Sequence, residues 1–124
     1  KGNEPENVAF GVYGKDELLF VNSERGSFTA VYDIKEKDEP ELIQVLPTGV
    51  GPEGSVTIPD RNLLAVAAEV DNRGDKIRSV ITIYERAFSS PDYPTMMSED
   101  RDDGTPIPFS ALSGLAAETR DLPK

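Results

Sequence analysis

The chain of 124 residues contains neither cysteine nor histidine. Without cysteine it can form no disulfide bond and no thiolate metal site. Without histidine it lacks the commonest general base, the serine–histidine–aspartate triad and most zinc sites. These two absences exclude several of the usual hydrolytic and metal centres.

Basic residues are also scarce, and no apolar run is long. Lys and Arg total 13 against 23 Asp and Glu, which gives a net charge of −10. A nucleic-acid-binding face needs clustered basic side chains, so we predict no nucleic-acid partner. No apolar run approaches the ~18 residues of a membrane span. The acidic excess favours solubility and is compatible with binding a cation.

What the sequence does contain is an internal repeat. "EPENVAFGVYGKDELLFVNSE" (Glu4–Glu24) resembles "GPEGSVTIPDRNLLAVAAE" (Gly51–Glu69), which follows at a spacing of about 45 to 50 residues. This period, with four strands per unit, is typical of β-propellers. The sequence therefore predicts an all-β fold built from antiparallel four-stranded blades of a partial β-propeller.

Alternating apolar residues and turn signals place the strands. The expected strands of the first blade (residues 1–50) and the second blade (51–98) cover residues 8–12, 18–22, 28–34, 42–46, 55–58, 63–68, 79–84 and 95–98. Residues 99–124 are interpreted as an acidic loop and the start of a third blade, with 107–109 a brief strand or an irregular insert. A helix over 111–118 is the alternative there, although Gly114 and the short length argue against it.

Several motifs carry a resemblance to a known family. "GPEG", "IPDRNLLAVAAE", "VITIYER" and "YPTMMSEDRDDGTPIPFSALSGLAAE" resemble the esterase-like phytase family, which comprises bacterial, usually exported β-propeller proteins. The resemblance covers Pro5–Glu118, and known members are several times longer. It therefore implies a fragment of about two blades whose partners are the remaining blades of a parent chain. It also implies a periplasmic or extracellular location.

The glutamate of the Pro-Glu-Gly turn, Glu53, and its counterpart Glu6 are the first candidate metal ligands. Inner strands of a propeller start at the rim of a central channel, so carboxylates repeated there would converge. Such rings of oxygen ligands suit Ca²⁺. The motif also resembles the metal-binding glutamate of calcium-dependent lactonase propellers. The alternative is a turn hydrogen bond at Glu53, with Gly54 permitting close packing.

The acidic loop 99–104 supplies the second candidates, Asp100, Asp102 and Asp103. Carboxylates this close repel one another unless a cation or Arg101 intervenes. They could hold Ca²⁺, and a bound cation could in turn hold a phosphate substrate. The alternative is a plain solvated loop.

Other polar residues are interpreted structurally. The loop 71–75 lacks the ligand spacing of an EF-hand. A nucleophilic serine needs a base, and neither a G-x-S-x-G elbow nor a dinucleotide or phosphate-binding glycine pattern occurs, so no organic cofactor is expected. The residues assigned to caps, packing or turns are Glu24, Glu69, Tyr32, Tyr84, Ser55, Ser110 and Ser113.

The functional hypothesis follows from the resemblance. It is metal-assisted hydrolysis of a phosphate or carboxyl ester by the full-length protein, with no complete active site in this fragment. The alternatives are a non-catalytic propeller that binds a protein or glycan through its loops, and a structural repeat domain of a surface protein. Because an incomplete propeller exposes apolar faces, association between copies is also expected.

Overall fold

A computed structural model describes residues 2–91, 95–96, 99–105 and 107 of the chain. The expected third blade, residues 108 and 109 of the brief strand expected over 107–109, and the alternative helix over 111–118 lie outside the described residues, and Ile107 itself is exposed and outside any strand. No helix in the described part of the chain is long and apolar enough to cross a membrane.

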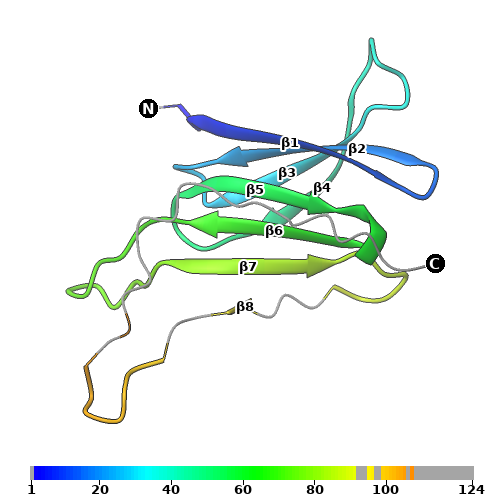
Figure 1. Ribbon diagram of the computed structural model, residues 1–124. Coiled ribbons are helices and arrows are strands. Elements are labelled where there is room, and N and C mark those ends of the chain that lie inside the picture. The colour runs from blue at the N-terminus through cyan, green and yellow to red at the C-terminus, as the bar shows by residue number, and fades with distance from the viewer. Residues whose placement is uncertain (1, 92–94, 97–98, 106, 108–124) are drawn as a thin grey trace.

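The first repeat forms one four-stranded antiparallel sheet. Its strands are β1 (Pro5–Tyr13), β2 (Asp16–Ser23), β3 (Phe28–Asp33) and β4 (Glu41–Pro47), in the order β1-β2-β3-β4 (Figure 1). Short polar turns join the strands, and the turn after β1 places Gly14 at φ +69°, a conformation that glycine adopts without steric cost.

The second repeat forms a second sheet of the same order. Its strands are β5 (Pro52–Ile58), β6 (Leu63–Ala68), β7 (Val80–Glu85) and β8 (Thr95–Met96), and a single 3₁₀ turn, η1 (Pro59–Arg61), joins β5 to β6. The predicted all-β class and strand order are confirmed. The bounds differ: β5 begins earlier than expected, and β8 has only two described residues.

The duplication extends to the details of hydrogen bonding. In each sheet the pairing of the first two strands is interrupted by one extra residue, Glu6 in β1 and Glu53 in β5. The Glu24 N–H donates to the Glu4 carbonyl at 3.0 Å, and the Glu69 N–H donates to the Gly51 carbonyl at 2.9 Å. The two repeats therefore adopt the same local structure, including its irregularities.

The hydrophobic core lies between the two sheets. Strand alternation sends one set of apolar side chains from each sheet into this space. At its centre Tyr13 and Phe20 meet edge to face, with ring centroids 6.0 Å apart. The Tyr13 hydroxyl donates to the Leu63 carbonyl at 2.7 Å, and the Tyr84 hydroxyl donates to the Pro47 carbonyl. The core cluster comprises Tyr13, Leu18, Phe20, Val31, Leu46, Leu64, Val66 and Tyr84.

The sheets are closest at their first strands. β1 and β5 lie side by side (Figure 1), and the Thr57 hydroxyl donates to the Phe10 carbonyl at 2.8 Å. A Cβ at Gly11 would lie only 3.0 Å from the Thr57 Cβ, so glycine permits this approach. Farther out, a cavity of about 680 Å³ is bordered by Ile43 of β4 and Ile83 of β7. The sheets thus diverge from the inner strands toward the outer ones.

Candidate metal site

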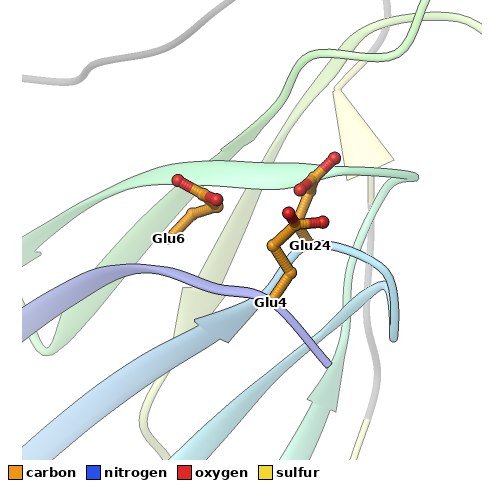
Figure 2. Close-up of side chains that lie close together, drawn as sticks. All are labelled: Glu4, Glu6 and Glu24. Carbon is orange, nitrogen blue, oxygen red and sulfur yellow. The ribbon is translucent and has the colours of Figure 1, made fainter. Parts of the chain in front are cut away.

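Three glutamates meet where β1 begins and β2 ends. Glu4 precedes β1, Glu6 is the extra residue of its bulge, and Glu24 follows β2 (Figure 2). One carboxylate oxygen from each lies within 4.8 Å of the others. We refer to Glu4, Glu6 and Glu24 as the glutamate cluster.

The backbone explains why these side chains meet. A bulge places an additional residue opposite one partner and redirects its side chain, so Glu6 leaves the regular alternation of β1. The hydrogen bond between Glu24 and Glu4 holds the strand ends together. Glu4 has φ +50°, a left-handed conformation that costs a residue with a side chain about 1 kcal/mol. Its equivalent in the second repeat is Gly51, at φ +72°, which adopts it freely.

The equivalent positions of the second sheet bear a second pair of carboxylates, Glu53 and Glu69. Loss of hydration raises the pKa of Glu69, and the negative charge of Glu53, a hydrogen bond with it and the more distant charge of Glu6 raise it further. β1 and β5 lie side by side and begin at the same end of the structure (Figure 1), so the acidic ends of the two sheets face a common region. Carboxylates of both repeats therefore line one end of the structure.

Electrostatic crowding is also present inside the glutamate cluster. Loss of hydration is the largest cause that raises the pKa of Glu24. The charge of Glu4, a hydrogen bond with Glu4 and the charge of Glu6 raise it further, and the charge of Arg25 lowers it. Arg25 forms an ion pair with Glu4. One guanidinium thus faces three carboxylates, so the cluster keeps an excess of negative charge that a cation would neutralise.

The donor set matches the chemistry of a hard cation. Three carboxylates offer up to six oxygens, and Ca²⁺ takes six to eight oxygen ligands in flexible geometry. The described residues contain no other group of three or more carboxylates this close together. The donor set is therefore compatible with a divalent cation, and the three side chains come from positions whose backbone is held by the sheet.

The structure places the predicted ligands in two regions. Glu6 lies in the glutamate cluster and Glu53 at the equivalent bulge of the second sheet. Asp100, Asp102 and Asp103 lie in a separate exposed loop (Figure 1). A metal role for these aspartates stays a prediction.

Asp103 has a structural partner within that loop. Its carboxylate accepts hydrogen bonds from the Thr105 hydroxyl at 2.5 Å and from the Thr105 N–H at 2.9 Å. These bonds lower the pKa of Asp103. These two hydrogen bonds explain the position of the Asp103 carboxylate without a bound cation.

Sequence reasoning missed part of the cluster. Glu24 was interpreted as a strand-end cap, whereas its carboxyl group lies with those of Glu4 and Glu6. The sequence pattern gives no indication of Glu4 as a ligand. The signal that could have identified Glu4 is its position opposite the chain leaving β2, because the pairing of Pro5 with Ser23 brings residues 4 and 24 together.

The remaining polar candidates from the sequence that lie in the described part of the chain have structural roles. The Ser55 hydroxyl donates to the Asn22 Oδ1 at 3.0 Å, and Tyr84 belongs to the core. In the loop after β6, Asn72 Oδ1 accepts the Gly74 N–H at 3.0 Å, as in a solvated turn. Ser110 and Ser113 lie outside the described residues.

No model of a known protein family matches the chain, and no similar curated protein or solved structure was found. Membership of the esterase-like phytase family therefore stays a prediction.

The raised pKa values predict how stability depends on pH. Because Glu24 and Glu69 have pKa values above 4.5 in the folded state, the folded protein binds these protons more tightly than the unfolded chain. Their ionised forms therefore destabilise the fold above the raised pKa values, and this effect is relieved as the pH falls toward 4.5. In chelator, we expect Glu24→Gln/Glu69→Gln to be more stable than the wild type at pH 7.

Chemical denaturation at pH 7 and at pH 4 measures this difference. The gain in stability of the double variant over the wild type should shrink at the lower pH, where the wild-type carboxyls are protonated. It should also shrink in high salt. Glu39→Gln, in an exposed loop, is the matched control and should show neither gain nor pH dependence. A double variant less stable than the wild type at pH 7 would contradict the prediction.

Proposed function

We propose that the chain comprises two consecutive blades of a β-propeller and binds Ca²⁺ at the glutamate cluster. The main support for this proposal is that the same four-stranded sheet occurs twice. Each sheet has a glutamate at the equivalent bulge, Glu6 in the first and Glu53 in the second. Divergence of the sheets from their inner strands supports a radial arrangement, as in propeller blades. The carboxylates at one end of β1 and β5 then lie toward the channel.

The proposed role in the complete protein is metal-assisted hydrolysis of a phosphate or carboxyl ester. A bound divalent cation supplies Lewis-acid polarisation of such an ester and a counter-charge for its oxygens. Glu4, Glu6 and Glu24 would hold the cation, and the bulge and the backbone bond between Glu24 and Glu4 would fix their positions. This part of the proposal rests on the motif resemblance, and the remaining blades would complete the site.

Calcium is expected to raise the melting temperature. At a Kd of about 0.1 to 1 mM, usual for extracellular calcium modules, 10 mM Ca²⁺ would stabilise the fold by about 1.4 to 2.7 kcal/mol. For a chain of this size this corresponds to a rise of about 5 to 10 °C. Differential scanning calorimetry with 10 mM CaCl₂ against EDTA, at constant ionic strength, measures it.

Variants separate specific binding from general screening. Glu6→Gln/Glu24→Gln should lose the calcium-dependent rise, whereas Glu39→Gln, which removes one exposed carboxylate elsewhere, should keep it. Mg²⁺ should have a smaller effect because it demands a stricter octahedral geometry. An equal rise in all three proteins would show that the cation only screens the net charge, and it would refute the site.

A further inference from the structure

One face of the first sheet is apolar and uncovered. Its two central cross-strand rows span all four strands and contain no charged side chain. On the two outermost strands, Val8, Phe10, Leu42 and Val45 are 57%, 51%, 52% and 51% exposed. We call this surface the open face; its rows are Phe10–Leu19–Tyr32–Leu42 and Val8–Val21–Ala30–Val45.

The orientation of these side chains follows from their neighbours. Gly11 and Tyr13 face the second sheet, because Gly11 meets Thr57 and the Tyr13 hydroxyl reaches Leu63. Since side chains alternate along a strand, Val8 and Phe10 point the opposite way. The open face therefore lies on the side of the first sheet away from the second.

The two rows of the open face differ in size on every strand. The neighbouring large and small members are Phe10 and Val8 on β1, Leu19 and Val21 on β2, Tyr32 and Ala30 on β3, and Leu42 and Val45 on β4. We call them the large row and the small row. Ala30 is only 7% exposed, because its short side chain stands between the larger Val21 and Val45. The open face therefore has a ridge along one row and a shallow groove along the other.

The second repeat shows that a face of this kind is normally covered. Its rows Thr57–Leu64–Tyr84 and Ser55–Val66–Thr82 are equivalent to the large and small rows. There Leu64, Val66 and Tyr84 are only 3%, 0% and 7% exposed, because the first sheet packs on them. The same face is thus buried in one repeat and exposed in the other, and a contiguous exposed apolar patch marks an interaction site.

We propose that the open faces of two copies pack on each other in a two-fold symmetric dimer. A two-fold axis that runs between the rows and parallel to them places the large row of each copy on the small row of the other. Tyr32 of one copy then meets Ala30 of the other, and Phe10 meets Val8. Large side chains thus meet small ones, as close packing requires. Sheets commonly pack face to face with their strands within about 30° of each other.

Electrostatics also favours a second copy at this face. The chain has a net charge of −10, so two copies repel wherever their acidic surfaces approach. The open face carries no charge in its two rows, so two copies can meet there without opposing carboxylates. Because an isologous contact uses the open face of both copies, assembly stops at the dimer. Repulsion between the remaining surfaces should make the dimer weaker at low salt.

The inference rests on the first sheet and not on cation binding, so it is tested in EDTA. Light scattering after size exclusion should give a mass that rises with concentration from the 13.5 kDa of one chain to twice that value and no further. A small interface of this kind calls for a range of about 1 to 200 µM. Phe10→Asp should be monomeric throughout, because burying an unpaired carboxylate opposes the contact. Phe88→Asp, at a fully exposed loop site, should dimerise like the wild type.

Mixing distinguishes the symmetric contact from a head-to-tail one. Fluorescently labelled Phe10→Asp should not bind excess wild type in sedimentation velocity, because a symmetric contact needs an open face on both copies. In a head-to-tail contact the variant would keep its other surface and would bind. Circular dichroism establishes that each variant keeps its sheets.

A size exchange tests the register of the rows. Ala30→Phe should weaken the dimer, because the new ring meets Tyr32 of the other copy. Ala30→Phe/Tyr32→Ala should regain most of the affinity, because each new ring then meets an alanine. A wild type that stays monomeric at the highest concentration, a mass that grows beyond the dimer, a Phe10→Asp variant that binds the wild type, or a double variant no tighter than Ala30→Phe would overturn the proposal.

Discussion

Replacing Phe20 by alanine is expected to lower the free energy of unfolding by about 3 to 5 kcal/mol, the usual cost of removing a buried phenylalanine ring. Phe20 is 5% exposed, meets Tyr13 edge to face and lies in the cluster shared by both sheets. Its loss removes contacts on both sides of the interface between the sheets. For a chain of this length, we expect the melting temperature to fall by more than about 10 °C.

Phe88→Ala provides the matched control. The same ring is removed, but Phe88 is fully exposed in the loop after β7, so the change should stay within about 0.5 kcal/mol. Urea denaturation followed by circular dichroism measures both variants. Equal destabilisation of the two variants, or none in either, would be incompatible with a core between the sheets.

Asn22→Leu is expected to destabilise the fold by about 2 to 3 kcal/mol. Asn22 is fully buried, and its Oδ1 accepts the hydroxyls of Thr29 at 2.8 Å and of Ser55 at 3.0 Å. The second bond connects the two sheets. Leucine accepts neither bond, and each hydroxyl left unpaired costs about 1 to 3 kcal/mol where it is buried. Thermal and urea denaturation measure the loss.

A triple variant tests whether unpaired hydroxyls cause that loss. Asn22→Leu/Thr29→Val/Ser55→Ala removes all three polar partners together, and such replacements can be nearly neutral. We therefore expect the triple variant to regain most of the stability lost in Asn22→Leu. If the stability losses of the three substitutions simply add, unpaired hydroxyls do not cause the loss in Asn22→Leu. The poor fit of the leucine side chain then causes it.

Most of the strand order could be predicted because the determining signals are local. Alternation in residues 8–12 and the β-branched run 79–84 specify strands without reference to distant parts of the chain. The predicted bounds of the strands were less accurate than their order. β5 begins at Pro52 because the bulge lets the chain pair before Gly54, and an irregularity of this kind leaves no clear periodic signal.

The candidate site was predicted only in part. The repeat identified Glu6 and Glu53 as equivalent carboxylates, and they occupy equivalent bulges, one in each sheet. Contact between Glu4 and Glu24 depends on the register of β1 against β2, which places residues about 20 positions apart together. The left-handed conformation of Glu4 is also set by that pairing. Sequence patterns report local preference, so neither feature could be read from them.

The outer strand of the first sheet has a consequence for self-assembly into fibrils. β4 presents an apolar, exposed edge, which is the usual template for unlimited strand addition. Its pairing with β3 is interrupted at Ile43, and prolines at positions 40 and 47 flank its central residues. A kinked edge bounded by residues without N–H donors cannot support a long continuous ladder. The same strand that adds apolar surface to the molecule is thereby protected against amyloid-like growth.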